Sequence, residues 1–410
     1  MQSIAFTVLT RDGDETFGKV QWEISATSGT SYEVGGGLLR RQAPDNLSAR
    51  ASSDCVILTA TWMATPSASD QLCPSPRMHV TVVLVTSPVP SHPSTALIET
   101  VLRSFEVVPG LSSCRRVLMC DGARCGPRNA YKRGRVTEQT IKRYTEYLDR
   151  VIALTSAPDS VFYGVEVVRL ARRVGFGGCV SHGLTLVTTP LVMIVQHDWK
   201  FDGYVDLPRV ISAINVCPDI RYVGFLSTSQ CLYVTRLKSC GQPALTRLDL
   251  RSRVVEGLPF IPLLFWHDKI HVCSVPHYRE MLASKHKEGE RGSVVKSGDF
   301  IEDTLGQLEL TEIKEQGMAA HARYATFLLG TGEDPKEAAV ISHMNGRAFL
   351  SPEQRLELPA YLRGAGAVES TDAGCSDSDE PELAGLSLSH GSEPSESAHE
   401  RPCCGGNPLQ

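Results

Sequence analysis

The stretch HVTVVLVT at residues 79–86 decides the fold. A continuous β-branched run of this length is typical of a strand that is buried on both faces of a sheet. RVLMCD at 116–121 and LVMIVQ at 191–196 have the same character. Amphipathic helices are predicted between these runs, at Thr95–Phe105 and from Thr137 onwards, because apolar residues recur there at helical spacing. Short buried strands that alternate with helices indicate an α/β fold with a mostly parallel, twisted sheet flanked by helices.

The same spacing rules predict the elements between and after these runs. A short strand is expected at Val151–Leu154 and a helix near Val165–Arg173. The glycines of Gly175–Gly178 predict a flexible link before a helix at Cys179–Val187. A long helix is expected from Thr304 to about Met318.

Composition divides the chain into three parts. Residues 1–76 are rich in Ser, Thr and Gly and hold strand-like stretches, which predicts a small N-terminal β-rich extension. Residues 77–350 hold the α/β domain. Residues 364–410 contain eight Ser, seven Gly, four Pro and no aromatic residue. Such a segment cannot bury enough apolar surface to fold, so a disordered acidic tail is expected there.

Charge and hydropathy exclude two classes of partner. The net charge is −5, of which residues 364–410 carry −8, so residues 1–363 carry +3 and offer no electrostatic basis for binding nucleic acid. The longest apolar runs, such as Leu258–Trp266, are far shorter than the roughly 20 residues that span a bilayer. The N-terminus lacks the basic region of a secretory signal. The thirteen cysteines contain no C-x-x-C pair, which favours buried free thiols in a reducing compartment. We therefore expect a soluble, cytoplasmic protein without a transmembrane segment.

Polar residues follow the predicted strands. In an open α/β sheet, ligands bind beyond the carboxyl ends of the strands. The residues at these ends are Thr86 and Ser87, then Asp121, then Gln196, His197, Asp198 and Trp199. Their side chains are the candidates for binding a ligand.

These strand ends and a later acidic pair resemble the GT-A-type glycosyltransferases, most nearly the large inverting family two. The resemblance covers roughly residues 78–330. It rests on VVLVTSPVPSHPSTALIETVLRSF at 82–105, VLMCDG at 117–122, GFGGCVSHGLTLVTTPLVMIVQHDWKF at 175–201 and GDFIEDTLGQ at 298–307, in this order. It implies a GT-A-like domain that transfers a sugar from a nucleotide-sugar donor to a hydroxyl acceptor with inversion. The acceptor class, whether glycan, protein or small molecule, is left open.

The resemblance also implies roles for single residues. It places Thr86, Ser87, Asp121, Gln196, Asp198 and Trp199 at the nucleotide sugar, Asp198 and His197 at a divalent cation (Mn²⁺ or Mg²⁺), and Glu302 with Asp303 at the catalytic base. The first Asp of the family's D-x-D motif is Gln196 here, and an amide is a weaker, neutral ligand. His271 or His277 could complete the site from a later loop.

The chemistry of these residue types is consistent with such a reaction. Departure of a nucleoside diphosphate leaves negative charge that a cation or basic side chains must stabilise. Hard cations prefer oxygen ligands such as the carboxylate of Asp198. Inverting transfer needs one carboxylate, here Asp303, to take the proton of the acceptor hydroxyl. Structural alternatives stay open: Asp198 could only end a strand, Asp121-Gly122 could form a turn, and Asp303 could cap a helix.

Two other functions fit the same sequence. The replacement at Gln196 is compatible with a non-catalytic binding protein on this fold. A nucleotidyltransferase would share the sheet, but the loop after the first strand is rich in Pro and Ser and lacks the expected Gly and basic residues. Cys179 with His182 lacks an orienting partner, so Cys179 is expected in the core.

Overall fold

The structure is a computed structural model of the chain and describes residues 74–125, 136–285 and 293–357, together with the backbone of short strands elsewhere. The chain divides into two compact units, Met1–Cys73 and Pro74–Gln410. The predicted tail at 364–410 lies outside the described residues.

The N-terminal unit contains antiparallel strand pairs, in keeping with its β-rich composition. The paired strands are β1 (Gln2–Ala5) with β6 (Thr59–Trp62), β2 (Thr7–Arg11) with β3 (Phe17–Gln21), and β4 (Ser31–Gly35) with β5 (Leu38–Gln42).

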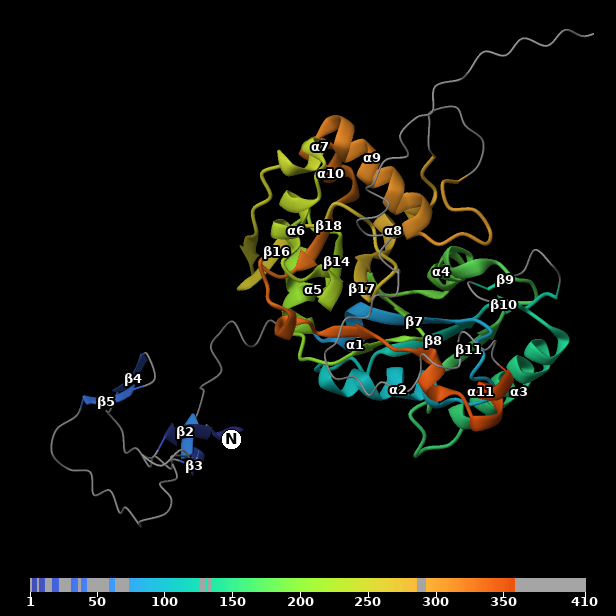
Figure 1. The fold of residues 1–410 in the computed structure, drawn as a ribbon, viewed down its shortest axis with the longest axis horizontal. Coiled ribbons are helices and arrows are strands. Elements are labelled where there is room, and N and C mark those ends of the chain that lie inside the picture. Colours follow the sequence, from blue (N-terminus) through green and yellow to red (C-terminus); the bar gives the residue numbers. More distant parts are fainter. Residues whose placement is uncertain are drawn as a thin grey trace, which may run out of the picture. The chain divides into compact units, whose positions relative to one another are not determined.

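The second unit is built on one nine-stranded sheet with the order β11-β8-β7-β12-β17-β14-β18-β16-β15 (Figure 1). The strands are β7 (Val80–Thr86), β8 (Arg115–Cys120), β11 (Glu166–Arg169), β12 (Leu191–Gln196), β14 (Tyr222–Phe225), β15 (Arg253–Val255), β16 (Leu258–Pro262), β17 (His271–Ser274) and β18 (Thr326–Leu329). The pairings place seven strands in one direction, and only β17 and β16 run against them. The predicted α/β class with a mostly parallel sheet is confirmed.

The helices cover both faces of this sheet. They are α1 (Pro76–His79), α2 (Ala96–Ser104), α3 (Glu138–Thr155), α4 (Gly175–Leu186), α5 (Leu207–Val216), α6 (Tyr233–Ser239), α7 (Pro243–Thr246), α8 (Val275–Leu282), α9 (Gln307–Gln316), α10 (Met318–Tyr324) and α11 (Pro352–Glu357). Among the described helices, none is long and apolar enough to cross a membrane. Short strands lie outside the main sheet: β13 (Trp199–Phe201) pairs with β19 (Ile341–His343), and β9 (Ala130–Tyr131) pairs with β10 (Gly134–Arg135).

Strand β7 is an interior strand of the sheet, and every one of its residues is buried. Its side chains alternate between two faces because successive residues of a strand point in opposite directions. Val82 and Leu84 join the cluster that contains α2, α3 and α5, whereas Val83 and Val85 join the cluster that contains α4 and α8. In Figure 1, α2 and α4 accordingly lie on opposite sides of β7 and β8. The sequence correctly predicted a strand that is buried on both faces.

Four predicted elements are wrong. The expected strand Val151–Leu154 belongs to α3, where Val151 continues the apolar stripe of a helix whose N-terminus Thr137 caps. The expected helix at Val165–Arg173 is instead β11, an edge strand that pairs in parallel with β8. The expected flexible link Gly175–Gly178 is the first turn of α4. The expected long helix Thr304–Met318 is broken into a π-helical turn, α9 and α10.

Candidate functional site

The carboxyl ends of three adjacent strands form one edge of the sheet. Strand β7 lies between β8 and β12 and is parallel to both. The backbone N–H of Asp121 donates to the carbonyl of Thr86 at 2.9 Å, and the N–H of His197 donates to the carbonyl of Val85 at 3.1 Å. The structure therefore brings Thr86, Asp121 and His197 together, as sequence order suggested; Ser87 follows directly and is half-buried.

The carboxylate of Asp121 holds the start of α4. Its two oxygens accept the backbone N–H groups of Val174 at 2.7 Å and of Gly175 at 3.1 Å. Burial raises the pKa of Asp121 above its ordinary value, against the opposing effect of these two hydrogen bonds. A carboxylate at the N-terminus of a helix is stabilised by unpaired N–H groups, which explains why the glycines at 175–178 are helical. A carboxylate has lone pairs beyond these two bonds, so it can still accept from a ligand.

A close contact between two glycines brings the acidic pair of residues 302–303 towards this edge. Gly175 has a φ of +75°, and a Cβ at this position would lie 2.6 Å from the Cα of Gly298. The N–H of Gly298 donates to the carbonyl of Val174 at 2.7 Å, one residue from the contacts of Asp121. The segment that begins at Gly298 therefore lies directly against the start of α4.

Glu302 and Asp303 lie in a π-helical turn, Glu302–Gly306, directly before α9. The N–H of Gly306 donates to the carbonyl of Ile301 at 3.1 Å, which is the wide spacing of a π turn. Asp303 is exposed and lies inside the turn, not at the residue that precedes a helix. The helix-capping alternative for Asp303 is therefore not realised.

A residue that the sequence analysis missed connects this turn to strand β12. The side-chain amide of Gln196 donates to the carbonyl of Asp268 at 3.0 Å. The N–H of Asp268 donates to Oε2 of Glu302 at 3.2 Å. Asp268 follows the apolar run Leu258–Trp266, so the rule applied to the other strand ends could have found it.

The imidazoles of two histidines lie near the carboxylate of Asp198. Nε2 of His343 donates to Oδ2 of Asp198 at 3.2 Å, and Nε2 of His197 lies 3.9 Å from the same oxygen. Although burial alone would raise it, the pKa of Asp198 is lowered, because both histidines favour the carboxylate. Within the part of the chain that the structure describes, Oδ1 of Asp198 is buried without a hydrogen-bond partner.

His343, and not His271 or His277, is the second histidine at Asp198. The pairing of β13 with β19 places His343 opposite Trp199. His271 instead contacts the hydroxyl of Tyr278 at 3.1 Å, and His277 contacts the carbonyl of Tyr324 at 2.8 Å. His271 is buried in the core and His277 is half-buried, and burial lowers the pKa of both.

Asp198 and His197 are the described side chains that could hold a divalent cation, and only together with a bound ligand. In the described ranges no three His, Cys, Asp or Glu side chains are arranged to hold a metal ion. Oδ1 of Asp198, the oxygen without a partner, is one hard donor, and Nε2 of His197 lies 3.9 Å from the other oxygen, Oδ2. An oxygen of a bound diphosphate would have to supply the further ligands.

Trp199 is half-buried beside the same cluster. Its ring centroid lies 5.5 Å from that of His343, at a steep angle, and 5.7 Å from Nζ of Lys269. The ring of Trp199, in β13, therefore lies near both a histidine and a lysine.

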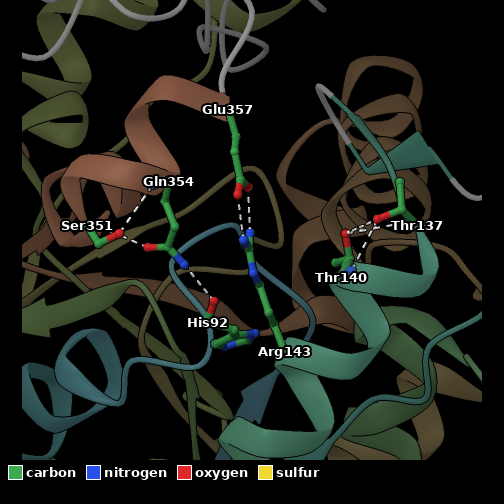
Figure 2. Close-up of polar contacts among 7 residues, drawn as sticks. All are labelled: His92, Thr137, Thr140, Arg143, Ser351, Gln354 and Glu357. Atoms are coloured by element: carbon green, nitrogen blue, oxygen red, sulfur yellow. Dashed lines mark hydrogen bonds and ion pairs between the residues drawn. The ribbon is translucent and has the colours of Figure 1, made fainter.

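The C-terminal helix α11 covers the loop that follows β7 (Figure 2). The side-chain amide of Gln354 donates to the carbonyl of His92 at 2.7 Å, and Arg143 of α3 forms a bidentate ion pair with Glu357 at 2.6 and 2.7 Å. The imidazole of His92 stacks on Tyr147 with 4.0 Å between ring centroids. Nothing in the sequence pattern indicated this contact, since it joins segments that are far apart in the chain.

Comparisons with known proteins give fold similarity only. No protein-family model and no curated protein matches the chain. A structure of glucosyl-3-phosphoglycerate synthase from Mycobacterium tuberculosis with Mn²⁺, UDP and glucosyl-3-phosphoglycerate aligns at 16% identity and a TM-score of 0.33, over 72% of this chain and 81% of that one. The same enzyme with Mg²⁺ and UDP aligns at 16% identity and a TM-score of 0.35, over 72% and 80%. TarS from S. aureus aligns at 10% identity and a TM-score of 0.33, over 66% of this chain and 38% of that one. Matches this distant do not establish a family, so a functional assignment has to rest on the site itself.

Proposed function

We propose that this chain transfers a sugar from a nucleotide-sugar donor to a hydroxyl acceptor by inverting displacement. The observation that carries the proposal is the path of hydrogen bonds from Gln196 through Asp268 to Glu302, which joins the end of β12 to the acidic turn. This path supports a donor-binding edge and a candidate base in one site, as a displacement reaction requires.

The donor side consists of the strand ends. Thr86, Ser87 and Asp121 would bind the nucleoside, and Asp198 with His197 would hold the diphosphate together with a divalent cation. A cation bound there would stabilise the charge that develops on the leaving group. Trp199 offers an aromatic face for the sugar.

The acceptor side consists of the turn at residues 302–303. Asp303 would take the proton of the acceptor hydroxyl. The oxygen of that hydroxyl would at the same time attack the anomeric carbon, on the side opposite the nucleotide. The new carbon–oxygen bond forms as the bond to the diphosphate breaks, and the nucleoside diphosphate leaves with the electron pair. Asp303 is exposed, so the proton can pass from it to solvent after transfer.

A donor-binding protein without catalytic activity is the second candidate. Gln196 replaces a carboxylate, and its side-chain N–H group is already used on the carbonyl of Asp268. A site with one carboxylate fewer would bind a nucleotide sugar but stabilise the departing charge less. The two functions share the donor edge and differ only in turnover.

We also propose residues 77–350 as the catalytic domain and the cytoplasm as its location. In the described part of the chain eight cysteines are free, and five of them are buried, which supports a reducing compartment. Fractionation of cells that express the tagged full chain tests the location.

The decisive experiment separates binding from transfer. Thermal shifts with a panel of nucleoside diphosphates, with and without Mn²⁺, identify the donor base through stabilisation by mass action. Transfer from the matching radiolabelled nucleotide sugar to water or to added acceptors is then measured for the wild type and for Asp303→Asn.

Asp303→Asn is expected to lower turnover by about 10²–10⁴-fold while nucleotide binding stays unchanged. Glu315→Gln is the matched control, because Glu315 is an exposed carboxylate on the adjoining helix α9. A nucleotide-dependent shift without any turnover would favour the binding protein. No shift with any nucleotide would exclude both candidates.

A further inference from the structure

Asp268 lies between β16 and β17 and makes hydrogen bonds to three different residues. Its carbonyl accepts from the side chain of Gln196 at 3.0 Å, and its N–H donates to Oε2 of Glu302 at 3.2 Å. Its own Oδ2 accepts the N–H of Ile301 at 3.2 Å. The residue is 1% exposed, so these contacts are shielded from water.

We propose that Asp268 is a positioning residue that fixes the Glu302–Asp303 turn against the end of β12. This inference rests on the proposed function, because it gives the carboxylate of Asp303 a constant place relative to a donor at Gln196 and Asp198. Asp268 itself contacts neither donor nor acceptor in this role.

The two hydrogen bonds between Asp268 and the turn are reciprocal. The backbone of Asp268 holds the side chain of Glu302, and the side chain of Asp268 holds the backbone of Ile301. A π turn is a wide and unfavourable form of helix that occurs mostly in single turns and often at functional sites. Contacts from outside the helix are therefore needed to keep the acidic pair in this conformation.

Close packing supports the same connection. A Cβ on Gly306, the last residue of the π turn, would lie 2.7 Å from the carbonyl oxygen of Trp266 and 2.9 Å from the ring of Phe265. The turn and the loop before Asp268 therefore touch without intervening space. Together with the two hydrogen bonds, this contact leaves the turn little freedom to move relative to the loop.

The surroundings of Asp268 favour its neutral form. Within the described residues its Oδ1 is buried without a hydrogen-bond partner, and a charged oxygen in that position would be costly. Burial first, and Glu302 and Asp303 next, raise the pKa of Asp268 well above its ordinary value. The phenols that face it, Tyr222 and Tyr278, also have a raised pKa and stay neutral. A neutral Asp268 can still accept the N–H of Ile301 through Oδ2.

Two substitutions at this position test the proposal. Asp268→Asn keeps an oxygen that can accept from Ile301 and carries no charge, so its turnover is expected within about threefold of the wild type. Asp268→Ala removes the acceptor, and kcat is expected to fall about 100-fold with little change in the donor KM, because small displacements of a catalytic group cost this much. If Asp268→Asn is as inactive as Asp268→Ala while both still fold, Asp268 is a reacting group and the proposal is wrong.

A further measurement does not depend on activity. Hydrogen exchange is expected to show protection lost selectively at residues 300–306 in Asp268→Ala and kept in Asp268→Asn. Unchanged exchange in Asp268→Ala would overturn the positioning role. If the wild type transfers no sugar, the proposed function fails, and hydrogen exchange still decides whether Asp268 holds the turn.

Discussion

The side-chain amide of Gln354 donates a 2.7 Å hydrogen bond to the backbone carbonyl of His92, although the two residues are 262 positions apart in the chain. This contact is buried and fixes α11 over the loop that follows β7 (Figure 2). The same loop carries His92 against Tyr147, whose hydroxyl lies 3.4 Å from Oγ1 of Thr86. The last helix that the structure describes is therefore connected to one of the residues proposed for the donor side.

Replacement of Gln354 by Ala is expected to weaken both stability and nucleotide binding. The carbonyl of His92 would be left buried without its partner, which costs about 1–3 kcal/mol of the free energy of unfolding. Looser packing of the loop is expected to raise the Kd of the bound nucleoside diphosphate about tenfold. Chemical denaturation and calorimetric titration measure the two effects. Leu356→Ala is the control, since Leu356 is on the same helix and 68% exposed. Equal results for the two variants would show that α11 does not shape the site.

The contact between Gly175 and Gly298 can be tested against a glycine with the same backbone conformation. Gly175→Ala introduces a Cβ at 2.6 Å from Gly298, whereas Gly164 has a φ of +73° with nothing within 4 Å. Both substitutions pay the strain of a positive φ, about 1 kcal/mol. Only Gly175→Ala is expected to lower the free energy of unfolding by a further amount, about 1–3 kcal/mol, because its Cβ pushes α4 away from the segment that leads to Asp303. Urea denaturation of the two variants gives the comparison, and equal losses would show that the close approach is unimportant.

Asp198→Asn is expected to remove the cation dependence of nucleotide binding. The amide keeps a hydrogen-bond acceptor for His343 but loses the charge that a hard cation requires. The part of the thermal shift with a nucleoside diphosphate that depends on Mn²⁺ is expected to disappear, and the part without Mn²⁺ to remain. Asp202→Asn is the matched control, because Asp202 is nearby in sequence and pairs with Lys200. A full Mn²⁺ response in Asp198→Asn would place the cation elsewhere.

Glu309 is expected to make the protein less stable as the pH rises. This carboxyl group of α9 is fully buried, accepts a hydrogen bond from Thr326, and has one oxygen without a partner among the described residues. Burial raises its pKa well above the ordinary value of 4.5, so the folded state holds the proton more tightly than the unfolded state. The contribution of Glu309 to stability is therefore fully present at a pH below its ordinary pKa. This contribution is lost as the pH rises towards the pKa that Glu309 has in the folded state.

Glu309→Gln tests this pH dependence. The substitution is expected to flatten that dependence and to raise the free energy of unfolding at neutral pH by about 1–3 kcal/mol. Denaturation curves at several pH values measure it, with Glu315→Gln as an exposed control. Parallel pH curves for Glu309→Gln and the wild type would mean that Glu309 is not protonated in the folded state.

The strands could be predicted because their hydrophobic runs are sufficient by themselves. The strand predicted at LVMIVQ, residues 191–196, has the same bounds as β12, since no polar residue interrupts the run before its end. Elements that depend on a partner were predicted wrongly. Residues 166–169 become a strand only because β8 offers a free edge, and Gly175–Gly178 become helical only because Asp121 satisfies the start of α4. Neither the pairing with β8 nor the hydrogen bonds of Asp121 can be predicted from local secondary-structure propensity.

The candidate site shows the same division. Asp121, Asp198 and Glu302 could be selected as polar residues in the order typical of a family. His343 could not, because a partner residue is defined by a distance and not by a motif. Asp268 follows an apolar run and could have been selected in the same way, but its contact with Glu302 could not be predicted. His343 reaches Asp198 through the pairing of β13 with β19, and Asp268 reaches Glu302 through the loop between β16 and β17.

The sequence by itself determined the α/β class, the burial on both faces of the strand predicted at residues 79–86, and the set of acids at the strand ends, because burial and alternation are properties of neighbouring residues. Only the tertiary structure decided which of these acids lie close together and which are neutral because they are buried. It also decided that α11 packs over the loop that follows β7. Those properties depend on contacts between residues that are 34 to 262 positions apart in the chain. The free energy of such contacts depends on packing and desolvation, which no local pattern records.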